Sequence, residues 1–334
     1  MTRRSEQLDN FMKKTEFAGA RLEPLAGDAS ARRYIRANIS GKQAMVMDTP
    51  VEGENFTAFV QIAEHLYNKN YSAPKILARD IREGFLLLED FGDESFSKIL
   101  NVNIDDEKPL YSAAIDLLAQ WYNSPIHSDM TLNFYDEELY MREISLFPDW
   151  FLPQIMGDER VAKLRSEYME IWREILRSFP LAKNIFVHRD FHADNLMWLS
   201  ERAGVKRIGL LDFQDAVIGD PAYDMVSLLE DARRDVPQQL VDLMIEKYIK
   251  QTGQGRDLFL SAYNILGAQR NSKIIGIFAR LAIRDGKQNY LKMLPRVWKH
   301  LERDIQHPLL KELRDWLSYN VADEFRGEIK LCRK

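Results

Sequence analysis

Three oxygen-bearing side chains follow two short apolar segments in the second half of the chain. Residues 185–187 lead towards Asp190, and Asn195 comes five residues after that aspartate. A second apolar segment, residues 208–211, runs directly into Asp212. In phosphoryl transfer, one carboxylate orients or deprotonates the attacking hydroxyl, and further oxygen donors hold Mg²⁺ against the phosphates. These residue types in this order therefore predict ATP-dependent transfer of a phosphoryl group.

The spacing assigns a role to each of the three residues. An aspartate followed five positions later by an asparagine, with a later Asp-Phe pair, matches the catalytic and metal-binding segments of kinases. We expect Asp190 to be the catalytic base, and Asn195 and Asp212 to be Mg²⁺ ligands. The alternative is that all three are turn residues, because Asp and Asn are common after strands.

Two histidines flank the expected base. His188 and His192 are four residues apart, a spacing that also occurs in zinc sites. A zinc-binding helix would need an H-E-x-x-H arrangement and a third ligand. We therefore interpret His188 as a buried residue that holds the catalytic loop by hydrogen bonds, and His192 as a residue that shapes the same loop.

The elements that would position these residues change character along the chain. Before residue 90, short apolar runs between turn signals predict strands at 22–50, 75–79 and 85–88, with one helix at 54–69. Beyond residue 93, helical spacing predominates, at 108–123, 136–146, 158–179, 222–232, 237–251, 255–283, 288–303 and 309–319. We expect a two-lobed α+β fold. A small antiparallel-sheet lobe at residues 1–91 would bind the nucleotide, and a large, mainly helical lobe at residues 92–334 would carry catalysis and substrate binding.

The composition restricts the classes of function. The chain has 334 residues, a net charge of −5 and 46% apolar residues, which is ordinary for a globular protein and offers no basic surface for nucleic acid. Its one cysteine, Cys332, excludes a disulfide within the chain. No secretory signal and no bilayer-spanning segment is visible. We expect a cytoplasmic monomer that acts on a small molecule, without nucleic-acid or membrane partners.

Residues 188–199 and 211–224 resemble the aminoglycoside phosphotransferase and choline kinase family. The second segment reads L-D-F-Q-D-A-V-I-G-D-P-A-Y-D. The resemblance implies a protein-kinase-like fold, ATP and Mg²⁺ as cofactors, and a small-molecule hydroxyl as acceptor. It also implies that Asp220 and Asp224 brace the metal-binding segment. A polar turn and a helix N-cap would be nearly the same interpretation of these two residues.

Within this family, the chain is most similar to anomeric sugar kinases that act on N-acetylmuramate and N-acetylglucosamine in cell-wall recycling. The similarity lies in residues 27–34, 85–93 and 269–282. It implies a sugar 1-phosphate as product. Two alternatives are an aminoglycoside or other small-alcohol phosphotransferase, and a catalytically inactive nucleotide-binding module. A protein kinase is disfavoured, because no A-P-E segment follows Asp212.

The expected nucleotide site departs from the usual kinase pattern. No G-x-G-x-x-G is present in the N-terminal part, where only Gly27 remains, so backbone amides of Asp28 to Ala31, with the Ser30 hydroxyl, would cover the phosphates. A plain hairpin turn is the alternative for this segment. Backbone groups around Glu89 and Phe91 would bind the adenine. The candidate walls of the adenine slot are Ile35, Met45 and Leu211.

The third expected strand also lacks a phosphate-binding lysine. Met47 and Asp48 stand in its place, and Phe59 falls where its acidic partner would be. Loss of both members of an ion pair is coherent, because either one alone would be an uncompensated charge. Arg33 would face the phosphates instead, or could equally be a solvated strand residue. The other candidate cations are Arg36 and Lys42.

The acceptor is expected to bind among the helices beyond residue 255. Lys273, Arg280 and Arg284 share one helical face approximately, which is either solvated or lines the site. A basic site would favour a neutral or anionic substrate over a polycationic aminoglycoside. We expect Arg270 to bind a substrate carboxylate and Gln269 to bind a sugar or acetamido group. Tyr140 and Arg142, on an earlier helix, are weaker candidates for substrate binding, and a structural role is favoured for each.

Overall fold

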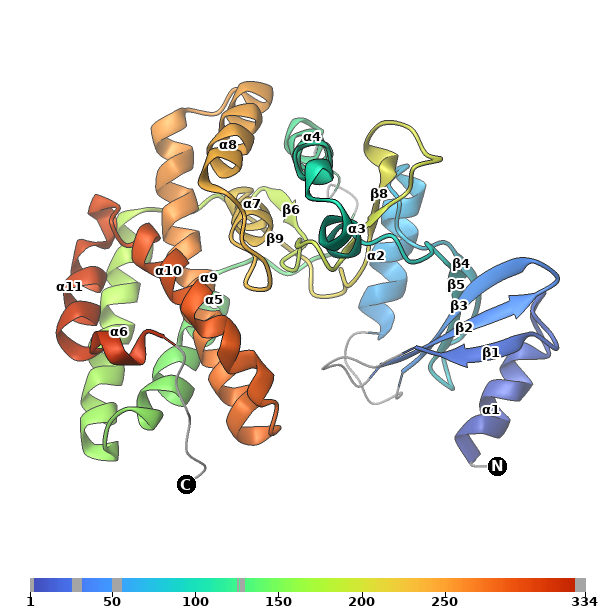
Figure 1. The fold of residues 1–334 in the computed structure, drawn as a ribbon, viewed down its shortest axis with the longest axis horizontal. Helices are drawn as coiled ribbons and strands as arrows, with labels where there is room; N and C mark the ends of the chain where they lie inside the picture. Colours follow the sequence, from blue (N-terminus) through green and yellow to red (C-terminus); the bar gives the residue numbers. More distant parts are fainter. Residues whose placement is uncertain (1–2, 26–31, 50–55, 125, 127–129, 328–334) are drawn as a thin grey trace. The chain divides into compact units, whose positions relative to one another are not determined.

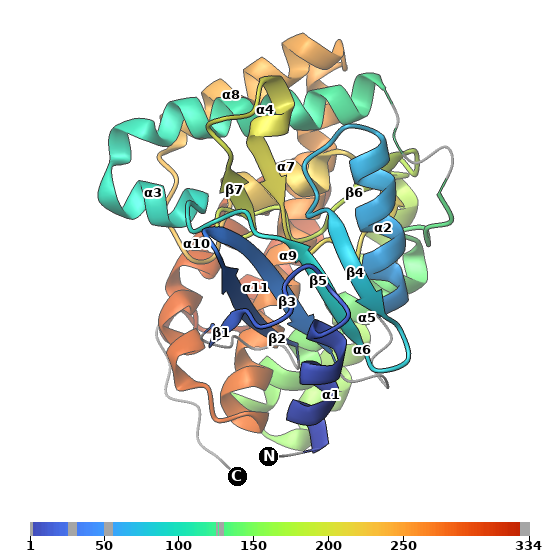
Figure 2. The ribbon, with the colours of Figure 1, turned by 90° about the vertical axis from the view of Figure 1, so that its right-hand side faces the viewer.

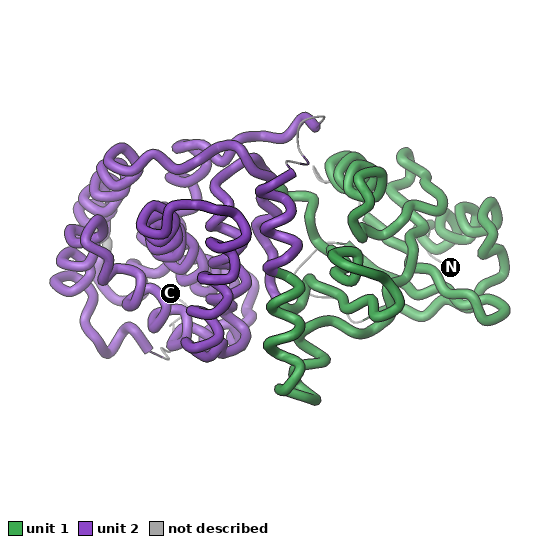
Figure 3. The backbone as a smooth tube through the Cα atoms, turned by 90° about the horizontal axis from the view of Figure 1, so that it is seen from above, with its two compact units in different colours: residues 1–114, 193–216 green, residues 115–192, 217–334 purple. Residues whose placement is uncertain are grey.

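The computed structural model describes residues 3–25, 32–49, 56–124, 126 and 130–327. By packing, the chain forms two compact units (Figure 3). The first unit contains residues 1–114 and 193–216, and the second contains residues 115–192 and 217–334. These units are defined by packing and not by function, so the expected lobe junction between residues 91 and 92 stays a prediction.

An antiparallel five-stranded sheet is the centre of the first unit (Figures 1 and 2), with the strands in the order β1–β2–β3–β5–β4. Their bounds are β1 Arg21–Pro24, β2 Arg33–Ile39, β3 Lys42–Asp48, β4 Ile76–Asp80 and β5 Phe85–Glu89. Tyr34, Met47 and Leu86 lie opposite one another on neighbouring strands. Because directly paired residues point to the same face, these three share one face of the sheet. The predicted N-terminal antiparallel sheet is confirmed.

Helix α1 (Arg3–Met12) covers the other face of this sheet (Figure 1). Its Leu8, Phe11 and Met12 are buried in one core cluster with sheet residues that include Val46. The sequence predicts no helix here, because the segment is rich in charged residues. Ile35 also packs against this cluster, so the expectation that it forms a wall of the adenine slot is wrong.

The rest of the first unit comes from helices and a hairpin. Helix α2 (Phe56–Asn68) lies alongside β4 (Figure 2). Helix α3 (Phe96–Val102) is capped by Ser95, whose Oγ accepts a hydrogen bond from the N–H of Lys98. Strands β7 (Leu196–Trp198) and β8 (Ile208–Leu210) form an antiparallel hairpin. Helix α4 (Glu107–Asn123) begins in this unit and ends in the second.

The second unit is mainly helical, as predicted. Helix α9 (Arg256–Arg284) packs against α5, α7 and α10, and strand β6 (Ile185–Val187) pairs with β9 (Val217–Gly219). The other helices are α5 Glu137–Ile144, α6 Asp158–Ser178, α7 Ala222–Leu229, α8 Gln238–Thr252, α10 Leu294–Asp304 and α11 Lys311–Asn320. The expected helix at 288–303 is divided: a 3₁₀ segment, Gln288–Met293, precedes α10. Pro295 stands in the first turn of α10, where its missing N–H costs nothing.

Short irregular helices connect these elements. The 3₁₀ helices are Ile104–Asp106, Leu152–Gln154, Gly204–Arg207, Pro308–Leu310 and Asp323–Phe325, and a π-helix spans Phe147–Phe151. Among the described residues, none of the helices has the length and apolar character that crossing a bilayer requires.

Candidate active site

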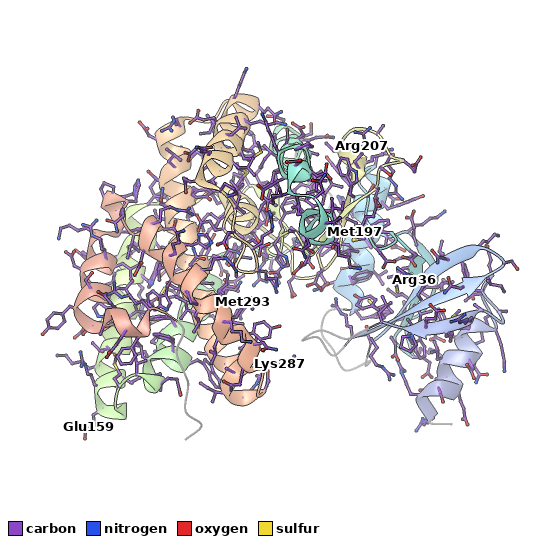
Figure 4. All side chains as sticks on the ribbon, in the orientation of Figure 1. Arg36, Glu159, Met197, Arg207, Lys287 and Met293 are labelled. Atoms are coloured by element: carbon purple, nitrogen blue, oxygen red, sulfur yellow. The ribbon has the colours of Figure 1, made fainter. Side chains whose placement is uncertain are left out.

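The β7–β8 hairpin positions the two predicted metal ligands in the first unit. The backbone N–H of Leu211 donates to the carbonyl of Asn195 at 3.0 Å, and Asp212 is the next residue. Asn195 comes directly before β7, and Asp212 comes shortly after β8. Because the two strands are antiparallel, the structure brings these two residues to the same end of the hairpin. Met197 and Arg207 mark this part of the first unit in Figure 4.

Asp212 is half exposed and has polar neighbours. Its side chain is 50% exposed, and its φ of 62° is a left-handed conformation that residues other than glycine adopt mainly at constrained sites. Gln214 donates to its Oδ1 at 2.9 Å. A half-exposed carboxylate beside an amide offers the hard oxygen donors that Mg²⁺ takes, usually with few protein ligands. Asn195 and Asp212 therefore fit such an ion.

Arg32 is a cation beside this carboxylate that the sequence reading misses. Its Nη1 lies 3.7 Å from Oδ1 of Asp212, and its side chain is 9% exposed. Its guanidinium also lies over the ring of Phe59, 5.9 Å from the centroid. Phe59 in turn stacks on Phe213 at 4.9 Å. Strand alternation is the signal that could have identified it, since Arg32 stands two residues before Tyr34.

Tyr34 connects Arg32 to the middle of the sheet. Burial raises the pKa of its phenol, while the charge and hydrogen bond of Arg32 partly oppose that rise. Its hydroxyl also lies 3.7 Å from the sulfur of Met47. Arg32, Tyr34 and Met47 therefore form one contiguous group on the sheet face opposite α1.

The cations that the sequence reading names have other contacts. Arg33 forms an ion pair with Asp48, which also accepts from Nε of Arg4 at 2.9 Å. Arg36, labelled in Figure 4, donates to Asp90 and Asp93. Lys42 is opposite Ile39, at the end of the β2–β3 hairpin far from Arg33. Gly27, Asp28 and Ser30 lie outside the described residues.

The residues predicted to bind the adenine, Glu89 and Phe91, are held by contacts within the first unit. The N–H of Glu89 donates to the carbonyl of Lys75 at 2.8 Å, and its carboxylate pairs with Arg202. The ring of Phe91 packs directly against Gly209, where an added Cβ would meet it at 2.9 Å. Adenine binding by the backbone around Glu89 and Phe91 stays a prediction.

Strand β6 leads into the predicted catalytic segment, residues 188–190, in the second unit. The carboxylate of Asp224 accepts the N–H groups of His188 and Arg189, at 2.7 and 2.9 Å. Arg189 has a φ of 74°, so these two bonds hold the chain in a left-handed conformation immediately before Asp190. Burial raises the pKa of Asp224 to about 7. Asp224 therefore braces the segment that carries Asp190. The resemblance had implied that it braces the metal-binding segment.

The other predicted support residues are also inside the second unit. Asp220 accepts the N–H groups of Ala182 and Ala222, both at 2.9 Å. His188 is buried, and Nε2 of His192 lies 3.3 Å from a guanidinium nitrogen of Arg233. Burial, together with Arg233, holds the pKa of His192 well below its usual range. No cluster of three or more His, Cys, Asp or Glu side chains is placed to bind a metal within the described part of the chain.

A buried glutamate, Glu143 of helix α5, links the catalytic segment to helix α9. Its carboxylate pairs with Arg189 and accepts from Nζ of Lys273 at 2.9 Å. The same carboxylate accepts from Gln269 at 3.0 Å and from the hydroxyl of Tyr135. Burial alone would raise the pKa of Glu143, but Lys273 and Arg189 lower it to about 2. Glu143 is therefore an ionised hub between two cations.

These cations also act on Asp190, which is half buried. Burial opposes ionisation of its carboxyl group, but Lys273, His192, Arg270 and Arg189 outweigh burial and lower the pKa of Asp190. At neutral pH, Asp190 is therefore a carboxylate in a positively charged setting. A carboxylate of this kind can accept a hydrogen bond from a hydroxyl group and orient it.

Helix α9 places the predicted substrate-binding residues inside the second unit. Gln269 is fully buried, and Arg270 is 5% exposed and donates to Oγ of Ser227 at 2.8 Å. Lys273 is 13% exposed, so it is not part of a solvated face, whereas the exposed Arg284 pairs with Asp285. From the earlier helix, Tyr140 is buried and stacks on Tyr135 at 4.0 Å, and Arg142 is exposed.

The sequence is similar to known kinases over almost its full length. An N-acetylmuramate/N-acetylglucosamine kinase of Caulobacter vibrioides is 34% identical, in an alignment that covers 95% of this chain and 96% of that protein. A kinase of the same name from Pseudomonas aeruginosa is 37% identical, over 91% of this chain and 89% of that protein.

Solved structures share the fold at much lower identity. Choline kinase LicA from Streptococcus pneumoniae superposes with a TM-score of 0.62 at 13% identity, covering 93% of this chain and 100% of that chain. The aminoglycoside phosphotransferase in the streptomycin–ATP–APH(2")-IIa complex superposes with a TM-score of 0.58 at 16% identity, over 91% and 96% of the two chains. The predicted kinase-like α+β fold is confirmed.

Residues 21–259 match the model of the phosphotransferase enzyme family. This match covers well over half of the chain, and the relatives named as kinases agree with it. The protein is a phosphotransferase with an alcohol group as acceptor, as predicted. The chain belongs to the phosphotransferase enzyme family.

Proposed function

We propose that this protein is an ATP- and Mg²⁺-dependent kinase that phosphorylates the anomeric hydroxyl of N-acetylmuramate or N-acetylglucosamine. The observation that carries the proposal is the ionised Asp190, on a loop held by Asp224 in a chain that is 34% identical to a kinase of that name. The reaction forms a bond between the sugar oxygen and the γ-phosphorus and releases ADP.

Each part of the proposed site has a defined task. Asp190 orients the acceptor hydroxyl and takes its proton, and catalysis rests mainly on positioning and charge stabilisation. Asn195 and Asp212 would hold Mg²⁺, which would supply positive charge to neutralise the phosphates. The backbone near Glu89 and Phe91 is the proposed adenine site. Gln269 and Arg270 remain proposed substrate contacts, although both have partners inside the second unit.

The electrostatics of the second unit favour an uncharged or anionic sugar. Asp190 has Lys273, Arg270 and Arg189 as its cationic neighbours. Glu143 is the acidic partner of Lys273 and Arg189. A polycationic acceptor would meet local repulsion here, whereas the carboxylate of N-acetylmuramate would not. This charge pattern favours the amino-sugar acceptor over the aminoglycoside alternative.

Substrate profiling tests the proposed acceptor. With ATP and Mg²⁺, ADP release is expected with N-acetylmuramate and N-acetylglucosamine, and not above background with kanamycin or choline. Glucosamine, which has a free amine in place of the acetamide, is the matched control for charge and should be the poorer acceptor. Turnover with kanamycin but with neither N-acetyl sugar would contradict the proposal.

Asp212→Asn tests the proposed Mg²⁺ site. The substitution keeps the shape of the side chain but removes the negative charge that binds the cation. We expect the Mg²⁺ concentration for half-maximal activity to rise at least about tenfold. The control is Glu201→Gln, an exposed acid near the β7–β8 hairpin, which should leave the Mg²⁺ titration unchanged. An unchanged titration in Asp212→Asn would exclude it as a ligand.

A further inference from the structure

The face of the sheet opposite α1 needs a cation if it is to bind phosphates, and strand β3 does not supply one. Met47 stands on this face opposite Tyr34 and Leu86, and it is fully buried. A thioether is a weak acceptor with no positive charge. Asp48, the next residue, carries a negative charge and is held by Arg4 and Arg33.

The three sheet cations that the sequence offers as candidates are paired with other residues or distant. Arg33 pairs with Asp48, and Arg36 pairs with Asp90 and Asp93. Lys42 stands at the opposite end of the β2–β3 hairpin from Arg33. It is six residues along β3 from Asp48, which is the partner of Arg33 in the sheet. At about 3.3 Å per residue, this separation is roughly 20 Å. Arg33 and Arg36 are therefore engaged by other carboxylates, and Lys42 lies at the far end of the hairpin.

Arg32 combines the three properties that a phosphate-binding cation needs here. It approaches Asp212, with 3.7 Å between Nη1 and Oδ1. It is nine-tenths buried, so its charge is little screened by water. It also lies over the ring of Phe59, the residue of α2 where an acidic partner would be expected. The cation–π contact with Phe59 holds the guanidinium without neutralising it.

We propose that Arg32 binds the phosphate groups of the nucleotide beside Asp212 and so takes the place of a lysine on strand β3. The proposal deepens the proposed function, because it rests on ATP as the phosphoryl donor. A guanidinium has five N–H donors in a planar fork, so one edge can face a carboxylate while another binds phosphate oxygens. In this arrangement, Met47 and Phe59 occupy the positions of the lysine and its acidic partner. The positive charge comes instead from Arg32, which lies over the ring of Phe59.

Nucleotide binding measured without any sugar tests this role. Displacement of a fluorescent ATP analogue gives the affinities of ATP and adenosine for the full chain and for Arg32→Met. We expect ATP to bind about 10- to 100-fold more weakly to the variant, as for loss of a hydrogen-bonded charge pair. Adenosine, which has no phosphate, should bind as it does to the unaltered protein. Arg32→Lys should recover part of the affinity for ATP.

Two further variants sharpen the test. Arg21→Met removes an 81% exposed arginine from strand β1 of the same sheet, and the affinity for ATP should not change. Arg33→Met examines the neighbouring arginine, and a loss of ATP affinity confined to that variant would overturn the assignment to Arg32. Unchanged ATP binding by Arg32→Met, or an equal loss of adenosine and ATP, would also overturn it.

The outcome is separable from the identity of the acceptor. If the protein binds ATP through Arg32 but phosphorylates no amino sugar, the proposed acceptor fails and the role of Arg32 stands. If amino sugars are phosphorylated and Arg32→Met binds ATP normally, the role of Arg32 fails and the acceptor stands. A protein that binds no nucleotide would contradict both.

Discussion

Asp190→Asn is expected to lower kcat by about 10³-fold, within the usual contribution of a positioned general base. The amide keeps the size of the side chain but accepts protons poorly and carries no charge. ATP affinity should change little, because Asp190 is proposed to contact the acceptor hydroxyl and other residues are proposed to bind the nucleotide. Steady-state kinetics with ATP and N-acetylmuramate, together with nucleotide displacement, separate the two effects.

The pKa of Asp190 adds a second expectation. Burial would favour the protonated form, but Lys273, His192 and the nearby arginines lower its pKa below the ordinary value. Asp190 is then ionised throughout the range from pH 5 to 8, so its titration should not reduce kcat there. The matched control is Asp194→Asn, an exposed residue of the same loop, which should remain active. Full activity of Asp190→Asn would remove Asp190 from the catalytic role.

Glu143→Gln is expected to destabilise the protein by about 3–5 kcal/mol, because it breaks a buried ion pair from one side. Lys273 and Arg189 would keep their charges but lose the carboxylate between them. Urea unfolding at pH 7 measures the change. The control is Glu138→Gln on the same helix, where the side chain is exposed, with an expected change within about 0.5 kcal/mol.

The effect of Glu143 should depend on pH in a defined direction. Its pKa is about 2 in the folded protein and 4.5 ordinarily, so the folded state binds fewer protons. The stabilisation is therefore complete above about pH 5 and is lost as the pH falls towards 2. The difference in unfolding free energy between Glu143→Gln and the unaltered protein should therefore narrow as the pH falls over that range. Adding Lys273→Met to Glu143→Gln should recover part of the stability, since it removes one uncompensated charge.

Equal stability of Glu143→Gln and the unaltered protein at pH 7 would show that the hub does not hold the catalytic segment. Glu143 is not proposed to touch the substrate. Its contact with Arg189 positions the backbone just before Asp190, so a variant that remains folded should lose kcat more than it loses affinity for ATP.

The parts of the site that are local in sequence could be predicted. Asp190 and Asn195 belong to one loop, and Asp212 is reached through a single hairpin, so spacing alone identifies them. Asp224 could be predicted as structural from the resemblance, but its partners could not. They are 36 and 35 residues away, and the bonds are to backbone N–H groups.

The parts that depend on distant packing could not be predicted. Glu143 meets Gln269 and Lys273 across 126 and 130 residues of sequence, and no local pattern records that contact. Lys273 and the exposed Arg284 have the same charge and are expected on the same face of the helix. The sequence therefore does not distinguish the buried position from the solvated one. Helix α1 was obscured for a similar reason, because its charged residues outnumber the three that it buries.

The central claim is that this protein forms a sugar 1-phosphate, and the reducing end of the product tests it most directly. N-acetylglucosamine is incubated with ATP, Mg²⁺ and the protein, and both sugar-bound phosphate and remaining reducing sugar are measured. A phosphate on the anomeric oxygen blocks ring opening, so we expect one reducing end to be lost for each phosphate transferred. A phosphorylated product that keeps its reducing end, or ATP consumption without any sugar phosphate, would contradict the account.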